Sequence, residues 1–297
     1  MQNDNSKLKN HKDIKVLKFG EFPKLLKEIT DPPKHLFIRG DFPDEKENKF
    51  LCVVGSRKYT LYGKEVCKKI IEGLAGYPIV IVSGLAIGID SVAHNSALNV
   101  GLKTIAVPGS GLDDSVLYPS LNKNLAKKIL EKGGALISEF ESNFRATPWS
   151  FPQRNRIMAG ISHAVLVIEA EKISGTLITS RLATEYNRDV FTVPGSIFSK
   201  NSEGPHMLIQ TGATPITCSS DILVALNIEN EKNKNKKNLF ENLSKDEITV
   251  INLLIEPLIK DELIRKLSMP ISSVNILLSA MELKGLISEK MGKIFLE

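Results

Sequence analysis

Residues 78–97 read Pro-Ile-Val-Ile-Val-Ser-Gly-Leu-Ala-Ile-Gly-Ile-Asp-Ser-Val-Ala-His-Asn-Ser-Ala, and this stretch decides the class of fold. The apolar run at 79–82 is typical of a strand covered on both faces, as in a parallel sheet. Ser83, Gly84 and Gly88 then indicate a turn. Apolar residues return at helical spacing, at Ile89, Val92, Ala93 and Ala97. A helix start after a glycine turn favours an anion such as phosphate, although the glycines could equally serve tight packing alone.

The same pattern recurs along the chain, which predicts an α/β fold. Apolar strands are predicted at 51–54, 79–82, 104–107, 135–138, 164–168 and 190–193, with helices between them at 61–74, 89–97, 121–130 and 176–186. Strands that alternate with helices favour a mostly parallel, doubly wound sheet. Ligands of such sheets bind beyond the carboxyl ends of the strands, so we expect the glycine turns to meet along one edge.

The chain is predicted to hold two domains. Residues 1–226 form the large one, with a short N-terminal extension at 1–45. Residues 227–243 are mostly asparagine, lysine and glutamate, which indicates a polar linker. Residues 244–297 show three helical segments followed by a hairpin, the order of a winged helix. This small C-terminal winged-helix domain would be independent of the sheet.

Charge places the main binding surface on the large domain. The chain has a formal net charge of +5, and residues 1–226 carry 28 lysines and arginines against 23 acidic residues. Residues 244–297 carry 7 against 8, and the predicted third helix is almost neutral. Because nucleic-acid affinity is largely phosphate neutralisation, we expect the small domain to be a weak DNA contact or a protein-docking module.

Composition excludes several classes of protein. Cys52, Cys67 and Cys218 form no C-x-x-C pair, which favours core thiols in a reducing compartment. No apolar run approaches a membrane span and no signal peptide is evident, so we expect a cytoplasmic protein that makes no membrane contact. A Walker P-loop and a G-x-G-x-x-G fingerprint are both missing, and we predict no cofactor and no metal.

Two stretches supply the chemistry of the predicted binding edge. Gly55-Ser56-Arg57 follows the first strand of the pattern, and residues 151–160 read Phe-Pro-Gln-Arg-Asn-Arg-Ile-Met-Ala-Gly. An aromatic ring, two arginines and an amide at Phe151, Arg154, Asn155 and Arg156 can stack a base, hold phosphates and read a base edge. The alternative is a solvated charged turn.

Other candidates remain open at this stage. Asp90 and His94, four residues apart on one helix, could form an acid–base pair. We favour a structural role, with Asp90 as a cap and His94 hydrogen-bonded below the edge, and we count Gly88 with them as structural support. Gly175 and Thr176 fit phosphate contact and simple helix capping equally well.

Taken together, these motifs resemble the DNA-processing protein A (DprA/Smf) family. The ordered matches are Gly55-Ser56-Arg57, Ser83-Gly84-Leu85-Ala86-x-Gly88-Ile89-Asp90-x-x-Ala93-His94, Pro108-Gly109 with Gly111-Leu112-Asp113 and Tyr118-Pro119, Phe151-Pro152-x-Arg154-Asn155-Arg156-Ile157, Ser174-Gly175-Thr176-Leu177-Ile178-Thr179 and Val193-Pro194-Gly195. The resemblance runs from about residue 22 to residue 225, and the terminal winged helix also fits.

The resemblance implies an extended Rossmann-like domain that binds single-stranded DNA, forms a homodimer and loads the RecA recombinase onto incoming strands in natural transformation. It implies no reaction. The implied single-strand site is Gly55, Ser56, Arg57, Ser83, Gly84, Phe151, Arg154, Asn155 and Arg156, to which the helix start adds Gly175 and Thr176, with Gly88, Asp90 and His94 in support. Here Thr147-Pro148-Trp149-Ser150 replaces a basic residue sometimes found ahead of the phenylalanine.

Two other functions stay open. One is a nucleotide-cleaving phosphoribohydrolase of related fold, which needs a glutamate after the glycine-rich helix start, where this chain has Leu177-Ile178-Thr179. The other is a nucleotide-sensing winged-helix regulator, against which the neutral third helix argues.

Overall fold

The computed structural model describes residues 14–228, 243–254, 258–267, 269–284, 286–290 and 292–296. The chain divides into two units, residues 1–228 and 229–297. Most of the linker predicted at 227–243 lies outside the described residues, as do residues 1–13 of the predicted N-terminal extension.

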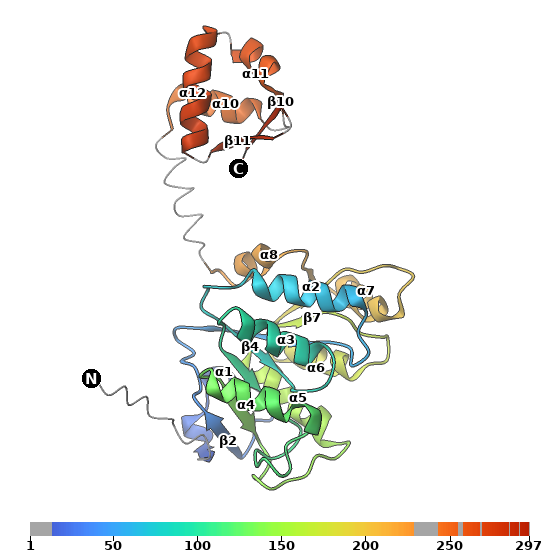
Figure 1. The fold of residues 1–297 in the computed structure, drawn as a ribbon. Helices are drawn as coiled ribbons and strands as arrows, with labels where there is room; N and C mark the ends of the chain where they lie inside the picture. Colours follow the sequence, from blue (N-terminus) through green and yellow to red (C-terminus); the bar gives the residue numbers. More distant parts are fainter. Residues whose placement is uncertain are drawn as a thin grey trace, which may run out of the picture. The chain divides into compact units, whose positions relative to one another are not determined.

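The first unit is built on one sheet (Figure 1). Across the sheet its described strands follow the order β1 (Ile14–Lys18), β2 (His35–Gly40), β6 (Ala135–Ser138), β5 (Thr104–Ala106), β4 (Ile79–Ser83), β3 (Lys49–Val54), β7 (Ala164–Val167), β8 (Asp189–Thr192) and β9 (Thr214–Pro215). Every neighbouring pair from β6 to β9 is parallel, whereas β2 is antiparallel to both β6 and β1. The prediction of a mostly parallel sheet is confirmed.

Helices cover both faces, as a doubly wound fold requires. They are α1 (Lys24–Lys27), α2 (Leu61–Glu72), α3 (Ile89–Asn99), α4 (Lys123–Glu131), α5 (Ser150–Ile161), α6 (Gly175–Glu185), α7 (Glu203–Gln210) and α8 (Ser219–Ala225), with short 3-10 turns at Phe19–Glu21, Ser120–Asn122 and Lys200–Ser202. Alternate residues of β3 point to opposite faces. Cys52 packs in one core with Ile157 of α5, while Val53 packs in another with Ile70 of α2 and Ile89 of α3. Figure 1 shows α2 and α3 side by side on one face.

The strand order places a crevice at one point of the sheet. From β3 the chain passes through α2 to β4 on one side, and it returns through α5 to β7 on the other side. Neighbouring turns that leave in opposite directions open a gap at the carboxyl ends of their strands. The turn after Val54 and the turn after Val167 therefore bound the natural binding crevice of this fold.

The second unit has its own core. Helices α10 (Lys245–Leu253), α11 (Lys260–Leu267) and α12 (Ile271–Leu283) pack with strands β10 (Leu258–Ile259), β11 (Ile287–Lys290) and β12 (Lys293–Leu296) around Val250, Leu263, Val274, Met281 and Ile294. The small sheet has the order β10-β12-β11, so it holds one strand more than the predicted hairpin. The winged-helix prediction is confirmed. In neither unit is any described helix both long enough and apolar enough to cross a bilayer.

Candidate functional site

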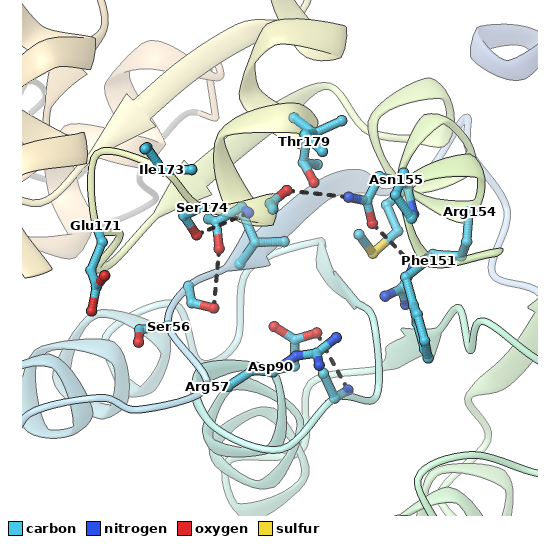
Figure 2. Close-up of a pocket in the computed structure, with 18 of the residues that line it drawn as sticks. Ser56, Arg57, Asp90, Phe151, Arg154, Asn155, Glu171, Ile173, Ser174 and Thr179 are labelled. Atoms are coloured by element: carbon cyan, nitrogen blue, oxygen red, sulfur yellow. Dashed lines mark hydrogen bonds between the residues drawn. The ribbon is translucent and has the colours of Figure 1, made fainter. Parts of the chain in front are cut away.

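A cavity of about 400 Å³ opens at the carboxyl ends of β3 and β7. We call it the β3–β7 cavity. Four segments line it: residues 54–58 at the end of β3, Ala86 and Asp90 after β4, the first turns of α5 from Phe151, and the segment from Glu171 into the start of α6. Figure 2 shows these segments converging on one space. Gly55, Ser56, Arg57, Asn155, Gly175 and Thr176, all predicted site residues, line this cavity.

Arg57 and Phe151 stand together at the cavity. The Arg57 guanidinium carbon lies 5.4 Å from the centroid of the Phe151 ring, and the Arg57 side chain is exposed. This distance allows a cation–π contact, which orients the guanidinium without using its N–H donors. The donors stay available for phosphate oxygens while the ring offers a surface for a base.

The start of α6 is built into the same wall. The Ser174 side chain accepts a hydrogen bond from the Thr176 backbone N–H, which caps the helix. The Thr176 hydroxyl donates to the Gly55 carbonyl at 3.2 Å, and the Asn155 amide donates to the Gly175 carbonyl at 3.3 Å. These bonds join β3, α5 and α6 around the cavity, and the positive end of the α6 dipole faces it.

Gly88 allows the Gly55-Ser56-Arg57 turn to lie where it does. Its φ is +98°, and a Cβ on Gly88 would come within 2.4 Å of the Ser56 carbonyl oxygen. The next residue, Ile89, donates its backbone N–H to that oxygen at 3.2 Å. Gly88 therefore supports the turn through backbone geometry, which is the kind of supporting role that the sequence analysis gave it.

The Asp90 side chain lies in the turn after β4, where the sequence predicted that an external anion could bind. Its buried carboxylate accepts the Gly84 backbone N–H at 3.0 Å and the Ala86 N–H at 3.4 Å. Burial raises the pKa of Asp90, and the nearby Arg154 charge opposes that shift. The protein's own carboxylate thus fills this anion position, and Asp90 caps the turn ahead of its helix.

His94 is part of the core. It is fully buried, and its Nδ1 lies 2.7 Å from the Thr104 hydroxyl. Burial lowers the pKa of His94 to about 3, so its imidazole is neutral at physiological pH. A neutral, buried ring agrees with the structural role that we favoured over an acid–base pair.

Arg154 and Ser83, two further predicted site residues, are both buried and bonded to backbone carbonyls. Arg154 is buried and donates to the Gly84 and Val107 carbonyls, so it ties the turns after β4 and β5 together. Burial lowers the pKa of Arg154 to about 10, and the side chain keeps its charge at neutral pH. Ser83 is the last residue of β4, and its buried hydroxyl donates to the Val53 carbonyl at 2.6 Å. Gly84, one residue later, lies at the edge of a neighbouring cavity.

Arg156, which was predicted to share the site with Arg57, is not among the residues that line this cavity. Its guanidinium forms an ion pair with Glu139 and bonds to the backbone carbonyl of Asp31. The side chains of Arg156 and Glu139 are only 11% and 7% exposed. Residues 151–158 are one helix, where each residue turns by about 100°. Phe151, Arg154 and Asn155 fall near one face, while Arg156 falls on another.

Several residues of the cavity were not predicted. The polar ones are Lys58, Glu171, Ser174 and Thr179, and the others are Val54, Ala86, Pro152, Met158, Ile173 and Ile178. Ser174 and Thr179 could have been found, because a helix that starts at Gly175 places its cap and its fifth residue near the same end. Within the described residues no group of three or more metal-ligating side chains occurs.

Comparison with known proteins identifies the family. The family model described as DNA recombination-mediator protein A matches residues 14–227, and the DprA winged helix domain matches residues 239–293. The chain belongs to the DNA recombination-mediator protein A family. The resemblance read from the motifs is confirmed.

Curated relatives share the large unit. Protein Smf of Escherichia coli is 44% identical over 202 residues, which is 68% of this chain and 53% of that protein. DNA processing protein DprA of Streptococcus pneumoniae is 45% identical over 202 residues, which is 68% of this chain and 70% of that protein. The chain thus matches about half the length of the first relative and about two thirds of the second.

Solved structures of the family show the same fold. DNA processing protein A of Streptococcus pneumoniae aligns with a TM-score of 0.66 and 40% identity, covering 72% of this chain and 75% of that one. The Helicobacter pylori protein aligns with a TM-score of 0.63 and 29% identity, covering 72% and 95%. The structure of the latter was reported for its single-stranded DNA binding mode.

Proposed function

We propose that this protein binds single-stranded DNA in the β3–β7 cavity, protects incoming strands and loads the RecA recombinase onto them during natural transformation. The membership of the family supports this function, as does the single-stranded DNA binding described for the Helicobacter pylori relative. The observation that carries it is the exposed Arg57 guanidinium held 5.4 Å from the Phe151 ring at the switch point of the sheet.

The chemistry of this cavity suits an unpaired strand. A base needs an aromatic face that only an unstacked nucleotide can reach, and Phe151 provides one. A phosphate needs exposed donors, which Arg57, Lys58 and the start of α6 provide. These groups read features common to every nucleotide, so the binding should be tolerant of sequence.

We further propose that the site binds without catalysing a reaction. Asp90, which lines the cavity, is committed to the Gly84 and Ala86 N–H groups, and Glu169, which lies outside it, accepts bonds from the backbone and hydroxyl of Thr60. Both buried carboxylates serve to hold loops in place. The proposed setting is the cytoplasm, with a homodimer as the working form and RecA as the protein partner.

The Arg57→Ala variant tests the proposal. We expect it to weaken binding of a single-stranded oligonucleotide about tenfold or more and to flatten the salt dependence by about 0.7 in log–log slope, the value for one lost phosphate contact. Arg57→Lys should recover the slope but only part of the affinity, because an ammonium lacks the planar stacking surface. Electrophoretic shifts and fluorescence titrations across a salt series measure both.

Lys127→Ala is the matched control, since Lys127 is exposed on α4 and its loss changes the net charge equally. A duplex and free mononucleotides belong in the same titration. Equal affinity for duplex and single strand, or release of free base from a nucleotide, would contradict the proposal.

A further inference from the structure

A second, smaller cavity adjoins the first. It has a volume of about 190 Å³ and lies over the carboxyl ends of β4 and β5, so we call it the β4–β5 cavity. Arg57, Ala86, Phe151 and Arg154 line both cavities. The Arg57–Phe151 pair is therefore a shared boundary, and a chain molecule that leaves one cavity across this pair enters the other.

The walls of the β4–β5 cavity are aromatic and aliphatic. The Tyr118 ring lies 5.6 Å from the Phe151 ring, centroid to centroid, with a 53° tilt between them. Tyr118 is 48% exposed, and the neighbouring lining residues Ile87 and Leu121 are 45% and 82% exposed. Exposed apolar side chains gathered around a small hollow mark a binding surface, and a volume of about 190 Å³ suits one ring-sized group rather than a whole nucleotide.

The charge of this cavity suits an anionic ligand. Its described lining includes Arg57 and Arg154 and contains no carboxylate, whereas Asp90 and Glu171 line the larger cavity. Arg154 donates to backbone carbonyls, and its positive charge makes the electrostatic potential of the cavity more positive. The exposed Arg57 has N–H donors available between the two cavities. An anionic group that crosses the boundary would meet Arg57 directly.

We propose that the β4–β5 cavity is a second base site, which takes the nucleotide adjacent to the one in the β3–β7 cavity. The phosphate between the two nucleotides then lies against Arg57, and the second base stacks on the exposed part of Tyr118 with Leu121 and Ile87 around it. This inference rests on the proposed function. It makes the dinucleotide, rather than the mononucleotide, the smallest unit that uses the whole site.

Short ligands test the second site on the full chain. We would titrate the protein with thymidine monophosphate, the 5′-phosphorylated thymidine dinucleotide and a hexanucleotide. The expected result is a marked gain in affinity from the mononucleotide to the dinucleotide. Tyr118→Leu and Leu121→Glu should each lower the affinity for the dinucleotide and the hexanucleotide about five- to hundredfold, which is the range for one stacked base. The affinity for the mononucleotide should stay within about twofold.

Controls separate the second site from the first. Phe19→Leu removes an aromatic ring that is 50% exposed, much like Tyr118, and that follows the edge strand β1. It should leave the affinity for all three ligands unchanged. Leu121 is so exposed that its variant should fold, which a thermal melt verifies. If Tyr118→Leu and Leu121→Glu lose equal affinity for the mononucleotide and the dinucleotide, or lose none for either, the proposal of a second base site is wrong. If Arg57→Ala still weakens the hexanucleotide, the proposed function survives that result; if the wild-type protein binds no oligonucleotide, both fail.

Discussion

At the residue scale, neighbouring side chains of α5 have separate tasks. Arg154 points into the cavity region and is fixed by the Gly84 and Val107 carbonyls, whereas Arg156 pairs with Glu139 on another side of the helix. Arg154 thus holds the turns after β4 and β5 against α5, and Arg156 holds the segments at Asp31 and Glu139. Of the predicted arginines, only Arg57 is exposed with its guanidinium at the cavity.

Arg156→Ala should therefore reduce stability more than binding. Removing one partner of a buried pair leaves the other charge unpaired, which costs about 3 kcal/mol when water is excluded. We expect a lower free energy of unfolding in urea and a change of about twofold or less in oligonucleotide affinity. The double variant Arg156→Met with Glu139→Leu should recover much of the stability. A tenfold loss of affinity at unchanged stability would return Arg156 to the binding site.

His94 should make the protein sensitive to mild acid. Burial lowers the pKa of His94 to about 3, against about 6.5 in the unfolded chain. Between these values the unfolded state binds a proton that the folded state does not, so stability falls as the pH falls from about 6.5. The loss is about 1.4 kcal/mol per pH unit for one proton. His94→Asn should flatten this dependence between pH 6.5 and 4.5 in denaturant unfolding.

The control for that measurement is His35→Asn, which changes an exposed histidine at the start of β2. The comparison between the two variants isolates the buried ring from the carboxylates, which also titrate toward acid pH. An unchanged slope in His94→Asn would mean that the ring takes up its proton in the folded state.

At the element scale, the site depends on how turns meet rather than on any one turn. The turn after β3 rests on Gly88 at the start of α3, and it bonds through Gly55 to Thr176 of α6. In the turn after β4, the Asp90 carboxylate accepts the Gly84 N–H, and the Arg154 guanidinium donates to the Gly84 carbonyl. A change in one turn should therefore move the next, because each of these contacts holds a backbone atom of the turn in place.

Gly88→Ala should weaken DNA binding indirectly, through the position of Arg57 and not through a contact between residue 88 and DNA. The added Cβ would clash with the Ser56 carbonyl, and the φ of +98° is strained for alanine by about 1–3 kcal/mol. We expect a lower melting temperature and a displaced Arg57, seen as a reduced salt slope. Gly20→Ala, where a Cβ meets nothing within 4 Å, is the matched control. Wild-type affinity in Gly88→Ala would mean that the Ser56 turn tolerates displacement.

At the scale of the whole molecule, each unit has its own core, and every residue that lines the two cavities belongs to the first. The second unit exposes Ile276 and Leu283, which lie seven residues apart on α12 and so share one face. Its only described basic side chain near the end of α12, Lys284, contacts Glu247 at 2.6 Å. This helix therefore offers an apolar surface and little positive charge to a duplex.

Deletion of residues 244–297 should leave most of the single-strand affinity intact. The reason is that the excess of basic over acidic residues and both cavities belong to the first unit. Fluorescence titration of the truncated and complete chains with the same oligonucleotide makes the comparison, and a melt confirms that the truncated chain folds. A loss of more than about tenfold would place a main contact in the winged helix.

The sequence by itself determined the doubly wound sheet, the winged helix and the family, because these depend on local periodicity and on ordered motifs. It also predicted that the Arg57 turn, Phe151 and the start of α6 would meet, and they line one cavity because carboxyl ends of parallel strands share an edge. Only the tertiary structure decided which charges are free. Arg154 and Arg156 look like ligand-binding groups in the chain, but partners distant in sequence bond to them, and that pairing follows from packing rather than from any local pattern.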